Sequence, residues 1–260
     1  MQKPPIVFIH GLWLLPSSWW QWEKYFNSLG YSTLSLSWPG DSTTVEEARQ
    51  HPERIAGIGM KQIADACAAQ IAELGEPPIV IGHSFGGLVA QELLGRGIGS
   101  AAIAIDPAPI KGVRSSPPSV LRSFLPFLIN PFNIHRAVLL SPGQFRYGFA
   151  NEVTEDTAKE LYDRYVVPAP AKPLFEVLVA TFGPGQAKAV NTTASRGPLL
   201  VIGGEKDHNA PPVFGQSTVR QYRGDSITEY HEFANRGHAL IIDDGWEEIA
   251  SYCAAWLGRG

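Results

Sequence analysis

The sequence predicts an α/β fold: a doubly wound, mostly parallel sheet with a mostly helical insertion. Short β-branched apolar runs alternate with longer helical segments, a pattern typical of a parallel sheet covered by helices on both faces. One apolar run ends on a serine flanked by glycines, and the alternation stops between residues 110 and 196. With 260 residues, the chain is long enough for one large domain with a sizeable core.

The apolar runs and helical stripes locate the elements in order. Strands are expected at 4–11, 31–40, 77–84, 101–109, 197–207 and 226–233. Helices are expected at 18–30, 54–74, 85–97 and about 246–257. The first helix is expected to be capped by Ser17 or Ser18 and to stop at Gly30. The second helix places an apolar stripe on one face, made of Ile55, Ile58, Ile63, Cys67 and Ile71.

The region from 110 to 196 is rich in proline and aromatic residues and contains no good buried strand. Helical pieces such as 155–165 occur in it, and a structureless loop of this length inside a domain would be unusual. We therefore expect a core formed by 1–109 and 197–260, with 110–196 as a helical cap.

Composition excludes several classes of function. The net charge of -4 does not favour a nucleic-acid partner, which needs a basic face. No apolar run approaches the roughly 20 residues of a membrane span, and the first residues lack a signal-peptide pattern. The two cysteines, Cys67 and Cys253, predict reduced, buried thiols and, weakly, a cytoplasmic location. No metal or cofactor motif occurs, so none is predicted, and the oligomeric state is left open.

The glycine-flanked serine belongs to a G-x-S-x-G motif at residues 82–86, between an expected strand and an expected helix. A serine on such a sharp turn is held clear of the sheet, and Gly82 and Gly86 leave room for the turn. The following helix directs its first amides at the serine, so the Phe85 amide could bind an oxyanion. Alternatively, Ser84 is only a helix cap.

Two residues downstream could activate the serine. Asp207 follows the penultimate strand and His238 follows the last strand, so both are expected at the sheet edge that carries Ser84. Serine needs a base, and the base needs an orienting group. Asp106 also ends a strand and is a rival for the acid, although we favour Asp207.

The loop after the first strand predicts a second oxyanion donor. Gly11 allows a close backbone approach, and the amide of Leu12 would supply the N–H group. The alternative is a simple turn with core tryptophans. The side chains expected beside the substrate are Trp13, His83, Phe124 and Phe127, although His83 could instead pack locally.

Together these motifs resemble the α/β-hydrolase superfamily. The resemblance rests on H-G-L-W at 10–13, S-W-P-G-D at 37–41, G-H-S-F-G-G at 82–87, G-G-E-K-D at 203–207 and R-G-H at 236–238. It implies Ser84 as nucleophile, His238 as base and then acid, Asp207 as orienting group, and the Leu12 and Phe85 amides as oxyanion hole. The order Ser, Asp, His is the one described for this fold.

The chain departs from many members by starting almost directly in a parallel strand, without an N-terminal hairpin. This compact start resembles the plant hydroxynitrile lyase and methylesterase branch. The lyases carry a threonine where this chain has Gly11, which argues for hydrolysis.

The expected function is hydrolysis of carboxylic esters of apolar, small to medium substrates through an acyl-enzyme on Ser84. Cleavage of a lactone, an amide or a carbon–carbon bond by the same residues remains an alternative. A non-catalytic ligand receptor is a third possibility, although a pure binder has no need for the three residues.

Overall fold

A six-stranded, wholly parallel sheet forms the centre of the molecule in a computed structural model that describes residues 3–113, 117–182 and 190–259. Its strand order is β2-β1-β3-β4-β7-β8. The strands are β1 (Ile6–Ile9), β2 (Thr33–Leu36), β3 (Ile79–His83), β4 (Ala101–Ile105), β7 (Leu199–Gly204) and β8 (Thr228–Phe233). All six expected strands are present, each shorter than its apolar run because the ends of the run form turns. The predicted fold class is confirmed.

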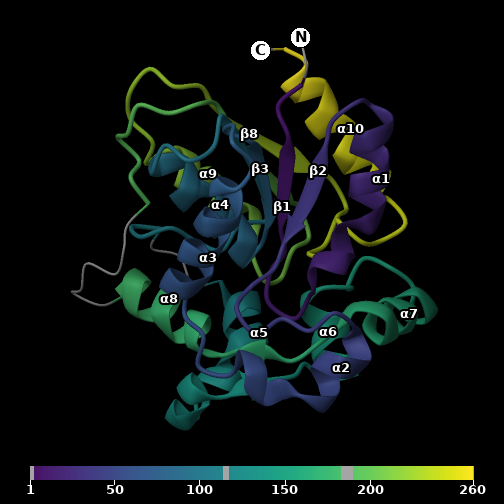
Figure 1. Cartoon of the computed structure of the whole chain (residues 1–260). Helices are drawn as coiled ribbons and strands as arrows, with labels where there is room; N and C mark the ends of the chain where they lie inside the picture. The colour runs from purple at the N-terminus through teal and green to yellow at the C-terminus, as the bar shows by residue number, and fades with distance from the viewer. Residues whose placement is uncertain (1–2, 114–116, 183–189, 260) are drawn as a thin grey trace.

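Helices cover both faces of the sheet. Helices α1 (Trp20–Ser28) and α10 (Trp246–Leu257) pack together on one face, while α3 (Met60–Ala72), α4 (Phe85–Gly95) and α9 (Pro212–Val219) lie on the other (Figure 1). The four central strands, β1, β3, β4 and β7, are buried along their whole length. Because both faces of these strands are buried, their sequences are continuously apolar and do not alternate between apolar and polar residues.

Two expectations about the helices need correction. The helix expected over 54–74 is divided into a 3-10 turn (Pro52–Ile55) and α3, because Gly57 adopts a positive φ of 73° between them. Two short helices were not expected from the sequence, α2 (Val45–Gln50) and α9. Helices of six and eight residues display too little of the 3.6-residue period to be recognised.

The segment between β4 and β7 is mostly helical. It contains α5 (Pro118–Leu128), a 3-10 helix η3 (Pro131–His135), α6 (Pro142–Gly148), α7 (Glu155–Tyr165) and α8 (Lys172–Phe182). Helix α7 has the bounds that the sequence predicts, and the Thr154 side chain caps it by accepting from the Thr157 amide. One antiparallel pair, β5 (Ala137–Val138) and β6 (Ala169–Pro170), was not expected, since two residues show no period. These helices lie at the end of the molecule opposite the chain termini (Figure 1).

An aromatic cluster joins β1 to α1. The Phe8 ring lies 4.9, 6.2 and 6.0 Å, between ring centroids, from Trp19, Trp22 and Phe26. The Trp22 indole N–H also donates to the Ile241 carbonyl at 2.9 Å. The first helix is therefore fastened to the loop that follows β8. Trp20 is 41% exposed and does not belong to this core.

Both cysteine thiols are buried and free, as expected. Burial raises the pKa of Cys67 to about 12 and raises that of Cys253 further, so both stay neutral near neutral pH. Among the described helices, none has the length and apolar character that a membrane crossing requires.

Candidate active site

Ser84 stands at the abrupt turn between β3 and α4. Its backbone torsion angles are φ 56° and ψ -119°, a conformation that a non-glycine residue rarely adopts. The Ser84 amide donates to the Ile105 carbonyl at 2.9 Å, and its carbonyl accepts from Leu88 and Ala108. These three bonds hold the strained residue between β4 and the first turn of α4.

The glycines on either side of Ser84 are required by contact distances. A Cβ atom on Gly82 would lie 2.1 Å from the Gly86 carbonyl oxygen, and one on Gly86 would lie 2.2 Å from the Ile9 oxygen. Both distances are far below van der Waals contact. The turn therefore forms only if both positions lack a side chain.

Ser84, His238 and Asp207 form a continuous hydrogen-bonded chain. His238 Nε2 lies 3.0 Å from Ser84 Oγ, and His238 Nδ1 lies 2.6 Å from Asp207 Oδ2. Asp207 Oδ1 accepts from the amides of Asn209 and Ala210 at 2.7 and 2.9 Å. Asp207 is thus buried with a hydrogen-bond partner for each of its carboxyl oxygens, as a buried polar group requires.

Asp106, the rival acid, lies close by but is placed differently. Its Oδ2 is 3.9 Å from His238 Nδ1, beyond hydrogen-bond distance, and has no hydrogen-bond partner in the structure. Its Oδ1 accepts from the Gly204 amide at 2.7 Å. Burial, and then the charge of Asp207, raise the pKa of Asp106 well above its usual value, so this carboxyl keeps its proton. The geometry therefore favours Asp207 as the partner of His238.

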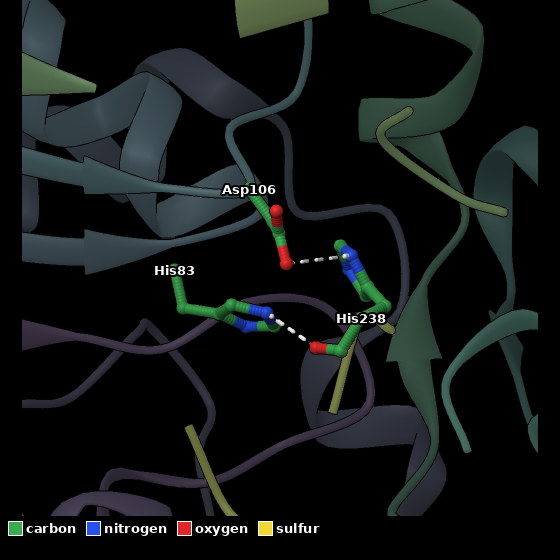
Figure 2. A group of neighbouring side chains, drawn as sticks. All are labelled: His83, Asp106 and His238. Atoms are coloured by element: carbon green, nitrogen blue, oxygen red, sulfur yellow. Dashed lines mark hydrogen bonds and ion pairs between the residues drawn. The ribbon is translucent and has the colours of Figure 1, made fainter. Parts of the chain in front are cut away.

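His83 does not contact the substrate cavity, contrary to the expectation from sequence. The side chain is fully buried, and His83 Nε2 donates to the His238 carbonyl at 2.9 Å (Figure 2). Burial, and then the neighbouring His238, hold the pKa of His83 well below its usual value, so the ring is neutral. Neighbouring side chains on the sharp turn point apart, which directs the His83 ring toward the backbone of the His238 loop.

His83, Asp106 and His238 could be mistaken for a metal site, since one ligand atom from each lies within 4.8 Å of the others (Figure 2). However, both ring nitrogens of His238 are already engaged, by Ser84 and Asp207. These contacts suit a hydrogen-bonded triad rather than metal coordination.

The two predicted oxyanion donors flank Ser84. A Cβ on Gly11 would lie 2.8 Å from Ser84 Cβ, so the loop carrying Leu12 passes directly against the serine. Phe85 is the first residue of α4, where the leading amides have no acceptor inside the helix. The loop that carries Leu12 and the start of α4 therefore both lie next to Ser84.

A cavity of about 290 Å³ opens onto Ser84. Helix α5 contributes Val120, Phe124 and Leu128, and α8 contributes Leu174. Apart from Ser84 and Asn209, the described residues that line the cavity are all apolar. Phe124 thus lies where the sequence predicted it. Trp13 and Phe127 are not among these lining residues: they are buried and their rings lie 5.6 Å apart, behind the wall.

Two residues near His238 were missed from the sequence. The Phe149 ring lies edge-on to the imidazole at 4.6 Å, and the Phe149 carbonyl accepts from the Ala239 amide at 2.9 Å. Asn209 is the polar residue of the cavity wall other than Ser84. Asn209 adjoins the motif around Asp207, which could have suggested it, whereas nothing in the sequence places Phe149 next to residue 238.

This fold and this site define an α/β-hydrolase. The model of the alpha/beta hydrolase family matches residues 6–252, and the chain belongs to that family. No curated protein sequence matches the chain.

Solved structures share the fold at low sequence identity. A monoacylglycerol lipase from Paleococcus ferrophilus has a TM-score of 0.70 at 20% identity, covering 98% of this chain and 95% of its own. A methylesterase from Arabidopsis has a TM-score of 0.68 at 15% identity, covering 99% and 100%. An extracellular α/β-hydrolase from a Paenibacillus species has a TM-score of 0.69 at 16% identity, covering 97% and 98%. At these identities the likeness shows the fold alone.

We predict that Gly82→Ala destabilises the protein, because the new Cβ would meet the backbone at Gly86. The free energy of unfolding, measured by urea denaturation, should fall by about 2 kcal/mol or more. Gly143→Ala is the matched control, since a Cβ there meets nothing within 4 Å and the residue lies in α6. Equal stability of the two variants would contradict the steric argument.

A second prediction concerns the buried carboxyl of Asp106. Because its folded pKa is raised, the native state keeps a proton that the unfolded chain releases above about pH 4, and stability falls as pH rises through this window. Asp106→Asn removes this dependence. Denaturant titrations between about pH 4 and pH 7 should show the variant gaining stability over the wild type as pH rises.

The half-buried Asp65 is the control for this titration, because its pKa is shifted in the opposite direction from that of Asp106. The pKa of Asp65 is lowered by the hydrogen bond from Lys61, so the wild type should gain stability over Asp65→Asn as pH rises through the acid range up to about pH 5, and the difference should then stay constant. Parallel stability curves for Asp106→Asn and the wild type would show that Asp106 is ionised in the native state.

Proposed function

We propose that the protein is a serine carboxylic ester hydrolase in which Ser84, His238 and Asp207 form the catalytic triad. The observation that carries the proposal is the pair of contacts at His238, 3.0 Å to Ser84 Oγ and 2.6 Å to Asp207 Oδ2. A hydroxyl, an imidazole and a carboxylate in this arrangement are what activation of a serine requires. Esterases and lipases among the similar folds are consistent with this chemistry.

Each residue has a defined step. Ser84 Oγ attacks the ester carbonyl while His238 Nε2 takes its proton, and Asp207 stabilises the imidazolium through Nδ1–H. The amides of Leu12 and Phe85 bind the oxyanion. His238 then returns the proton to the leaving alcohol, and water activated by the same imidazole releases the acid. The neutral His83 supports this cycle by holding the backbone carbonyl of the base.

The cavity suggests the class of substrate. No charged side chain is found among the described residues that line it, so a carboxylate or phosphate on the substrate would lose its water without a partner. We therefore assign neutral, apolar esters, with residues 110–196 acting as a cap over the core formed by 1–109 and 197–260. The lining from α5 and α8 supports this division. The cytoplasmic location stays a prediction.

Ser84→Ala is predicted to lose turnover of p-nitrophenyl esters by about 10⁴-fold or more while retaining its fold. A fluorophosphonate probe should label the wild type at Ser84 and leave the variant unlabelled. Ser251→Ala, an exposed serine on α10, is the control and should keep full activity. Undiminished turnover in Ser84→Ala would refute the mechanism, and absence of probe labelling in the wild type would favour a ligand receptor.

A panel of esters, lactones and amides separates the remaining enzyme alternatives. The apolar cavity predicts that kcat/KM is greatest for uncharged esters and falls sharply for esters that carry a carboxylate in the acyl group. Faster turnover of lactones or amides than of any ester would reassign the substrate class while leaving the triad in place.

Substitutions of the two buried acids are predicted to differ in their effect on kcat. Asp207→Asn should lower kcat by about 10³- to 10⁴-fold, because the amide cannot hold His238 in the required tautomer. Asp106→Asn should stay within about threefold of the wild type, since the native carboxyl is already neutral. The reverse pattern, loss in Asp106→Asn and retention in Asp207→Asn, would overturn the assignment of the acid.

A further inference from the structure

An apolar stripe lies exposed on α5 and η3. Leu121, Leu125, Ile129 and Phe132 are 50, 51, 70 and 71% exposed; the first three are spaced four residues apart along one side of α5 and its C-terminal end, and Phe132 follows in η3. We call these four residues the α5 stripe. Val179, 53% exposed, lies on α8, a helix that packs against both α5 and η3. Large apolar side chains gathered in this way usually mark an interaction surface.

The α5 stripe is continuous with the cavity that holds Ser84. Leu121, Leu125 and Ile129 are exposed and also line that cavity, together with Leu178 of α8. The path from the outer surface to the serine is therefore apolar throughout. An apolar molecule resting against the stripe could enter the cavity without crossing a polar rim, so the surface and the site belong together.

The charged side chains of the chain segment that carries the stripe have one sign. Residues 107–151 contain five lysines and arginines and no aspartate or glutamate, in a chain whose net charge is -4. Arg122 is exposed beside Leu121 and Leu125, and Arg136 is exposed directly after η3. On α8, Glu176 accepts from the Met60 amide and is thereby directed toward α3. An anionic surface complements this face.

We propose that the α5 stripe docks the protein on an anionic lipid surface, from which apolar ester substrates enter the cavity. Apolar side chains with interspersed cations are what binding at a lipid headgroup boundary requires. A second copy of the chain fits less well, because a symmetric contact would bring the Arg122 and Arg136 side chains of both copies together without an acid from 107–151. The inference rests on the proposed esterase function only for the substrate that enters.

Vesicle binding tests the docking separately from catalysis. Ser84→Ala protein, which leaves ester lipids intact, is sedimented with vesicles of equal phosphatidylglycerol and phosphatidylcholine, and with vesicles of phosphatidylcholine alone. The anionic vesicles should bind at least about tenfold more tightly, and binding should weaken in high salt. Adding Ile129→Ser and Phe132→Ser should lower the affinity by about tenfold or more.

The matched control is Ile227→Ser in the same Ser84→Ala background. Ile227 is 59% exposed but directly precedes β8, at the sheet edge opposite Ser84, so its loss should leave vesicle binding unchanged. Equal loss in the control and the stripe variant would overturn the proposal. So would absence of vesicle binding at low salt in a protein that hydrolyses soluble esters.

The oligomeric state distinguishes lipid docking from a contact between two copies of the chain. A dimer in gel filtration that Ile129→Ser and Phe132→Ser dissociate would show that the α5 stripe is a contact between copies, and would overturn lipid docking. A monomer that binds anionic vesicles supports it. If Ser84→Ala instead retained full turnover, the proposed function would fail while the vesicle result stood on its own.

Discussion

The close crossing of backbone at Gly82 and Gly86 is the constraint on which the site depends. Because no side chain separates the two residues, the chain turns from β3 into α4 at a single strained residue, Ser84. The same crossing presses Gly86 against the end of β1, so the loop beginning at Gly11 passes beside the serine. Ser84, the start of α4 and the loop that begins at Gly11 are therefore positioned by one packing contact.

Parallel pairing brings the other groups to this contact. Since β3, β4 and β7 are neighbours, the residues that follow them meet at one edge although they are far apart in sequence. Two carboxyls thereby reach His238, and hydrogen bonding distinguishes them. Asp207 has both oxygens satisfied, while Asp106 has one oxygen without a partner. The short loop at 207–210 thus supplies the hydrogen bonds that distinguish Asp207 from Asp106.

The six strands and the meeting of residues 84, 207 and 238 at one end of the sheet could be predicted from sequence, because apolar runs and the G-x-S-x-G motif mark parallel strands and their ends. The side-chain directions could not. His83 follows the strand period but points into the His238 loop, and Trp13 lies behind the cavity wall rather than on it. The residues that line the cavity depend on how α5 and α8 pack against the core. Such contacts between distant segments produce no periodic sequence pattern, so they could not be predicted.

The bond from the Trp22 indole to the Ile241 carbonyl has a consequence for heat inactivation. It ties the loop carrying His238 to the aromatic cluster around Phe8, three residues beyond the imidazole. Loosening that loop would require breaking into the core itself. Activity and tertiary structure should accordingly disappear in a single cooperative transition, with no inactive intermediate that remains folded.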